Sequence, residues 1–160
     1  MNIATLSLGF IDLPKTTTLN IFAQGCVHQC EGCSNPQCQP FSSEFMYTLT
    51  DELFDAILTK YKPITKWICW LGGDSTCQPL RLARLSQIAK ARGFNSCLYT
   101  GFKFASDEVQ SVLKHIDVII DGKWEGVPIT SEDSNQSIYI RKDNTFHKVS
   151  NWEKLYEEIK

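Results

Sequence analysis

The order of hydrophobic and polar residues along the chain predicts a regular exchange between strands and helices. Short apolar or alternating runs predict strands at residues 3–8, 17–23, 66–71, 94–100 and 116–120. Apolar residues spaced three and four apart predict helices at residues 51–61, 79–92, 106–114 and 152–159. Two further runs, 136–141 and 145–149, flank Asp143 and Asn144 and predict a hairpin. The segments 24–44 and 122–135 are expected to be irregular.

The order of these elements determines the expected fold class. From residue 17 onward strands alternate with helices, which is typical of an α/β fold with a mostly parallel sheet and right-handed crossovers. The length of 160 residues predicts a single domain, residues 1–160. The chain is too short for a complete eight-unit βα barrel, which needs about 250 residues.

Three unusual segments directly follow predicted strands. A cysteine-bearing loop follows strand 17–23, Gly72-Gly73-Asp74 follows strand 66–71, and Asp121-Gly122 follows strand 116–120. In sheets of this kind, ligands bind beyond the carboxyl ends of the parallel strands. The sequence therefore predicts that the cysteine loop belongs to a binding site at one edge of the sheet.

The cysteines themselves suggest metal binding. There are seven, an odd number, so they cannot all pair within one chain, and four lie in one loop: Cys26, Cys30, Cys33 and Cys38. The first residues lack the basic lead of a signal peptide, and no apolar run approaches the ~18 residues of a membrane span. We therefore expect a cytoplasmic protein, in which reduced thiols favour metal binding over disulfides.

The charge balance narrows the possible partners. The chain has sixteen Lys and Arg residues and eighteen Asp and Glu residues, which gives a formal charge of −2. A nearly neutral chain argues against a broad electrostatic contact with nucleic acid or with an anionic membrane. Neither is expected as a partner.

The cysteine spacing leaves two kinds of metal site open. Four thiolates including Cys38 would suit a closed structural zinc site. Three thiolates, Cys26, Cys30 and Cys33, would suit a four-iron cluster in which one iron has no protein ligand and is free to bind a substrate. The spacing differs from the ferredoxin patterns, which supply a fourth cysteine.

The run Cys26-Val27-His28-Gln29-Cys30-Glu31-Gly32-Cys33 resembles the signature of the radical S-adenosylmethionine enzymes. With its flanks, from Gln24 to Pro36, it is most similar to the activases of glycyl-radical enzymes, and among these to the activases of anaerobic ribonucleoside-triphosphate reductase. The resemblance extends over residues 10–141 and includes Gly72-Gly73-Asp74. One departure is Ser75-Thr76-Cys77, where the family usually has a proline directly after the Gly-Gly-acid segment.

The resemblance implies a partial, open βα barrel that binds a [4Fe-4S] cluster and S-adenosyl-L-methionine. The implied cluster ligands are Cys26, Cys30 and Cys33. The residues implied to contact S-adenosylmethionine are Gly32, Cys33, Ser34, Gly72, Gly73, Asp74, Thr100 and Asp121. No side chain is expected to act as a catalytic residue, because the reactive radical comes from the cofactor.

The implied activity is reductive cleavage of S-adenosylmethionine to a 5′-deoxyadenosyl radical, which then generates the glycyl radical of the reductase. The implied partners are the large subunit of anaerobic ribonucleoside-triphosphate reductase and an external low-potential electron donor. Two alternatives stay open: an activase of another glycyl-radical enzyme, and a zinc-stabilised α/β binding module.

Overall fold

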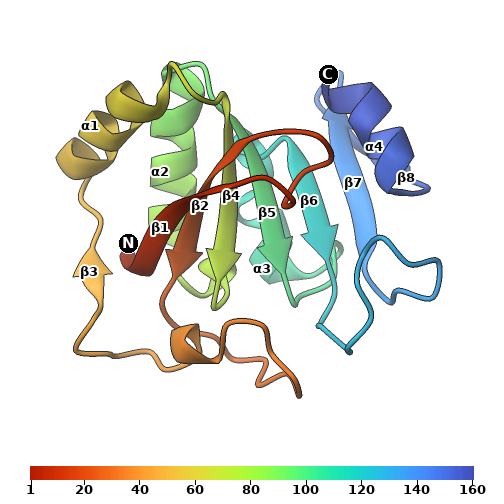
Figure 1. The fold of residues 1–160 in the computed structure, drawn as a ribbon, viewed down its shortest axis with the longest axis horizontal. Helices are drawn as coiled ribbons and strands as arrows, with labels where there is room; N and C mark the ends of the chain where they lie inside the picture. Colours follow the sequence, from red (N-terminus) through yellow and green to blue (C-terminus); the bar gives the residue numbers. More distant parts are fainter.

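The computed structural model describes residues 1–160 and contains one sheet of eight strands (Figure 1). The strands are β1 (Asn2–Gly9), β2 (Thr18–Ala23), β3 (Tyr47–Thr48), β4 (Trp67–Gly72), β5 (Asn95–Thr100), β6 (Val118–Asp121), β7 (Ser137–Lys142) and β8 (Thr145–Val149). Their order in the sheet is β3-β1-β2-β4-β5-β6-β7-β8. The four central strands, β2, β4, β5 and β6, are parallel, and the strands on either side of them pair antiparallel. This confirms the α/β class, with a mixed sheet whose four central strands are parallel.

The chain has seven helical segments, of which all but the C-terminal α4 lie between strands. The α-helices are α1 (Asp51–Tyr61), α2 (Pro79–Ala91), α3 (Asp107–Gln110) and α4 (Trp152–Ile159). Three short 3-10 helices are η1 (Pro36–Cys38), η2 (Ser75–Cys77) and η3 (Leu113–His115). None of the helices is long and apolar enough to cross a membrane.

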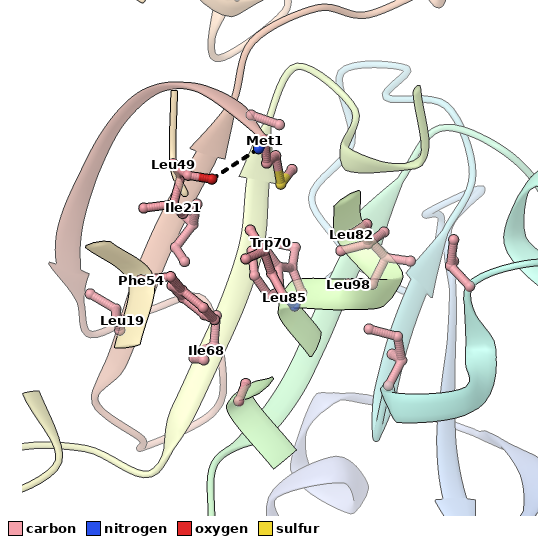
Figure 2. Packing of buried hydrophobic residues seen from close by; sticks show 14 of the residues in the cluster. Met1, Leu19, Ile21, Leu49, Phe54, Ile68, Trp70, Leu82, Leu85 and Leu98 are labelled. Carbon is pink, nitrogen blue, oxygen red and sulfur yellow. Dashed lines mark hydrogen bonds between the residues drawn. The ribbon is translucent and has the colours of Figure 1, made fainter. Parts of the chain in front are cut away.

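The larger hydrophobic core fills the space between the sheet and the helices α1, α2 and α3 (Figure 2). Phe54 of α1 packs against Trp70 of β4, with ring centroids 5.8 Å apart, and both side chains are fully buried. The remaining labelled core residues in Figure 2 are Met1, Leu19, Ile21, Leu49, Ile68, Leu82, Leu85 and Leu98. Burial of this apolar surface is the main force that holds the helices against the sheet.

The opposite face of the sheet has its own smaller core. Cys69 and Cys97, which are neighbours across β4 and β5, are buried there, as is Val118 of β6. Leu13 from the segment between β1 and β2 and Leu155 from α4 cover this face. Because both faces are covered, the central strands read as continuous apolar runs in the sequence.

Most predicted elements are present, and the exceptions have tertiary causes. The hairpin β7–β8 turns at Asp143 and Asn144, both with positive φ, as its Asn-containing turn predicts. The predicted helix 106–114 is wrong in length, since α3 ends at Gln110. Arg141 of β7 donates to the carbonyls of Leu113 and Ile116, so this segment turns into β6 instead of continuing the helix. The hydrophobic pattern of the sequence does not predict the two-residue strand β3.

The start of α1 allows a prediction about stability. The Thr50 hydroxyl accepts a hydrogen bond of 3.2 Å from the Leu53 N–H and so caps the helix. Thr50→Ala is expected to lower the free energy of unfolding by about 1 kcal/mol, the usual cost of losing such a cap. Urea denaturation measures this change. Thr59→Ala in the exposed interior of α1 is the control, and an equal loss there would contradict the capping explanation.

Candidate functional site

The cysteine loop lies beyond the carboxyl ends of β2, β4 and β5, where the sequence predicts it. Figure 1 shows the loop in orange below the tips of these strands. Backbone hydrogen bonds attach it to the sheet: Gly73 N–H donates to Ala23 at 2.9 Å, and Asp74 N–H donates to Gly25 at 2.8 Å. The loop also closes on itself, because Gly25 N–H donates to Cys38 at 2.8 Å. The loop is therefore held against the end of β4.

A pocket of about 290 Å³ opens between this loop and the strand ends. Several residues that the sequence singles out line it together: Cys26, Cys30, Cys33, Ser34, Gly72, Gly73 and Thr100. They come from the cysteine loop and from the ends of β4 and β5. The three thiols and the glycine pair thus share one cavity, although more than 40 residues separate Cys26 from Gly72.

Three other singled-out residues do not line the pocket. The Gly32 carbonyl accepts a hydrogen bond of 3.1 Å from the indole N–H of Trp124. Asp121, 1% exposed, accepts from the backbone N–H groups of Phe104 at 2.6 Å and Ser137 at 3.1 Å. Asp74 is equally buried, and its carboxylate also accepts from protein donors. Both carboxylates are occupied in joining neighbouring segments.

The apolar wall of the pocket was not anticipated from the sequence. It consists of Leu71, Tyr99, Trp124, Pro128 and Ile129. Three of these residues belong to the segment 122–135, which has no hydrophobic period and was expected only to be irregular. A tryptophan within such a polar segment is the one sequence feature that marks it. The Trp124 hydrogen bond to Gly32 brings this segment to the cysteine loop.

The thiols of the loop have the surroundings of iron ligands. Cys26 Sγ accepts a hydrogen bond from the His28 N–H and Cys33 Sγ accepts one from the Asn35 N–H, each at 3.4 Å. Such N–H donors stabilise the negative charge of thiolate ligands and tune iron–sulfur clusters. Burial raises the pKa of the Cys26 thiol, so its ionisation is coupled to binding a metal. The donor set therefore fits an iron–sulfur cluster held by three cysteines.

The other cysteines near the loop differ from these three. Cys38 is fully buried in η1, and burial raises its pKa. Burial and the charge of Asp74 raise the pKa of Cys77 to about 11, so this thiol is protonated at neutral pH. Neither residue lines the pocket. In addition, no three Cys, His, Asp or Glu side chains surround a point at which a single metal ion would bind.

Comparisons with known proteins agree with this geometry. Residues 16–140 match the family model of the 4Fe-4S single cluster domain. The anaerobic ribonucleoside-triphosphate reductase-activating protein of Vibrio cholerae is 34% identical over 118 residues, which cover 68% of this chain and 74% of that protein. The protein of the same name from Enterobacteria phage T4 is 32% identical over 111 residues, which cover 66% of this chain and 69% of that protein.

A third relative is named for activating a different enzyme. The pyruvate formate-lyase-activating enzyme of Staphylococcus aureus (strain USA300) is 30% identical over 124 residues, 71% of this chain. The match covers 49% of that enzyme, so the chain spans about half of its length.

The α/β sheet and its cysteine-lined pocket define an iron–sulfur protein of the single-cluster type. Within that class, the chain belongs to the radical S-adenosylmethionine family of glycyl-radical-enzyme activases.

Proposed function

We propose that this protein uses a [4Fe-4S] cluster and S-adenosylmethionine to generate the glycyl radical of an anaerobic ribonucleoside-triphosphate reductase. The observation that carries the proposal is that Cys26, Cys30 and Cys33 line one pocket with Gly72 and Gly73. The two relatives named for activating that reductase support the choice of target.

The three cysteines would hold three irons, which leaves the fourth for the amino and carboxylate groups of S-adenosylmethionine. A cluster bound there would supply the electron for reductive cleavage of the C–S bond of S-adenosylmethionine to a 5′-deoxyadenosyl radical. The chain itself positions the reactants and shields them from water, as proteins with such cofactors generally do.

Each wall of the pocket would have a separate role in binding S-adenosylmethionine. The backbone of Cys33, Ser34 and the Gly72-Gly73 pair would contact its polar groups beside the cluster, with Thr100 at the end of β5. Gly32, next to Cys33 in the loop, would add a backbone contact. The apolar wall around Tyr99 and Trp124 would cover its less polar parts. Asp74 and Asp121 would support these walls from behind, because their carboxylates accept hydrogen bonds from protein donors.

The proposed partners are the large subunit of the reductase, which carries the target glycine, and an external low-potential electron donor. The donor is required because the cluster must work near the low end of the range of iron–sulfur potentials. The relative named for pyruvate formate-lyase favours a second candidate, an activase of another glycyl-radical enzyme.

We also propose that the sheet is the open βα barrel of the radical S-adenosylmethionine type, and that residues 1–160 form one domain. The parallel order β2-β4-β5-β6 and the cores on both faces support this. All seven cysteines are free, which supports a location in the reducing cytoplasm.

Anaerobic reconstitution with iron and sulfide, followed by electron paramagnetic resonance, tests the proposal. The dithionite-reduced protein is expected to give a four-iron signal that changes when S-adenosylmethionine is added, because that cofactor binds the open iron. Mixing with the large reductase subunit should then produce a glycyl-radical signal, whereas mixing with pyruvate formate-lyase should not. A protein that takes up stoichiometric zinc and no cluster would contradict the proposal and favour the binding module.

A further inference from the structure

His28 lies between two of the proposed cluster ligands, yet its side chain is bonded to the sheet. Its Nε2–H donates to Asp74 Oδ2 at 2.8 Å, and only 13% of the His28 side chain and 1% of the Asp74 side chain are exposed. The two residues are 46 positions apart in the sequence. The hydrogen bond therefore joins the middle of the cysteine loop to the turn after β4.

Asp74 has no free acceptor capacity beyond the protein. Oδ1 accepts from Thr76 N–H at 3.0 Å and from the Thr76 hydroxyl at 2.6 Å. Besides His28, Oδ2 accepts from the Thr100 hydroxyl at 2.8 Å and from Gly101 N–H at 2.9 Å. A carboxylate offers about four lone-pair positions, so five donors saturate it. Asp74 thus connects the ends of β4 and β5 to the cysteine loop.

The imidazole ring is also fixed by packing. It meets the ring of Phe102 edge-on, with centroids 4.5 Å apart at 71°. On another side it lies against Gly101, where an added Cβ would be only 2.4 Å from the ring carbon Cδ2. The backbone N–H of His28 points to Cys26 Sγ at 3.4 Å. The position of this ring and the surroundings of a proposed cluster ligand are therefore set by the same residue.

We propose that His28 and Asp74 form a positioning pair that holds the cysteine loop at a set distance from the Gly72-Gly73 and Thr100 wall of the pocket. The inference rests on the proposed function and names the contact that would align the cluster with the binding site for S-adenosylmethionine. His28 also lines the pocket, and the role proposed for it is to position the loop and not to react.

Loss of the His28–Asp74 contact should disturb how the cluster is aligned with the binding site for S-adenosylmethionine. It should have less effect on assembly of the cluster itself. The three thiols lie in one short loop and can still bind iron together, whereas the loop would no longer be held against the wall. The His28 N–H to Cys26 Sγ bond would also weaken. Because donors to sulfur favour the more negative, reduced cluster, the reduction potential should fall.

His28→Phe tests the pair, since it keeps an aromatic ring against Phe102 and removes the donor to Asp74. The variant is expected to take up wild-type amounts of iron and sulfide after reconstitution. It should bind S-adenosylhomocysteine, a non-reacting probe, about tenfold more weakly by calorimetry, in line with loss of a hydrogen bond to a charged group. Its potential should be more negative, and S-adenosylmethionine should perturb its resonance spectrum less.

Three further variants complete the design. His28→Gln keeps an N–H donor of similar reach and should restore the affinity to within about twofold, as a positioning hydrogen bond requires. His147→Phe in the exposed hairpin, where the ring bonds only Thr145, is the matched control and should behave as wild type. If His28→Phe does not fold, Gly101→Ala introduces a methyl group against the same ring from the residue after β5 and should weaken probe binding in the same way.

The possible outcomes separate this inference from the proposed function. A wild-type protein that binds the cluster and the probe, beside a His28→Phe or Gly101→Ala variant with the same affinity, potential and spectrum, would overturn the positioning pair alone. A wild-type protein that binds neither would overturn the proposed function and this inference with it.

Discussion

Replacing Cys30 with serine is expected to abolish the iron–sulfur cluster and, with it, formation of the glycyl radical. Cys30 lines the pocket with Cys26 and Cys33, and a serine hydroxyl is a hard, weakly acidic group that replaces a soft thiolate poorly. Changes to residues that only orient metal ligands already cost 10–100-fold, so loss of a ligand should lower activity by more than about a hundredfold. Iron and sulfide content and the resonance signal of the reduced protein measure the effect.

Cys77→Ser is the matched control for that experiment. Cys77 is half-buried beside the same loop, but it does not line the pocket, and its pKa of about 11 keeps the thiol protonated. The variant should bind the same amount of iron as the wild type. Loss of the cluster in Cys77→Ser, or a full cluster in Cys30→Ser, would show that the ligand set is assigned incorrectly.

Gly73→Ala is expected to cause the second large effect, a loss of stability together with loss of cofactor binding. A Cβ at residue 73 would lie 2.3 Å from the Gly25 carbonyl oxygen and 2.6 Å from that of Cys38. Both oxygens already accept backbone hydrogen bonds, from Asp74 and Gly25 respectively, so neither can move without breaking them. We expect unfolding to become easier by about 3 kcal/mol, the upper end of the cost of overpacking. Urea denaturation and calorimetric titration with S-adenosylhomocysteine measure the two consequences.

Gly126→Ala separates this clash from the general cost of replacing a glycine. Gly126 has a φ of +84° and nothing within 4 Å of an added Cβ, so only backbone strain opposes alanine there. Its cost should be about 1 kcal/mol, with probe binding unchanged. Equal losses in the two variants would indicate that close packing of Gly73 against the loop is unimportant.

The sequence predicted those parts of the candidate site whose residues are close together in the chain. Cys26, Cys30 and Cys33 lie within one loop, so their spacing alone limits how they surround a ligand. It was also predictable that they share one pocket with Gly72 and Gly73, because the carboxyl ends of parallel strands lie at one edge of a sheet. The hydrogen bond of His28 to Asp74 was not predictable, because Asp74 comes from another strand end.

Asp74 shows why side-chain direction could not be derived from the motif. In the sequence it follows two glycines at a strand end and was expected to contact S-adenosylmethionine. In the structure Thr76, which lies in the segment that departs from the family pattern, donates twice to its carboxylate. The Thr100 hydroxyl and the Gly101 N–H donate hydrogen bonds to the other oxygen of this carboxylate. The burial of Asp74 thus depends on donors from three segments.

The sequence by itself determined the α/β order of the elements, the edge of the sheet at which the candidate site lies and the three thiols on one loop. These follow from hydrophobic period and from short spacings, which are local properties of the chain. Only the tertiary structure decided where helix 106–114 ends, that Trp124 reaches the cysteine loop and that Asp74 faces inward. Each of these depends on hydrogen bonds between residues far apart in the chain, whose partners are chosen when the sheet and its loops pack together.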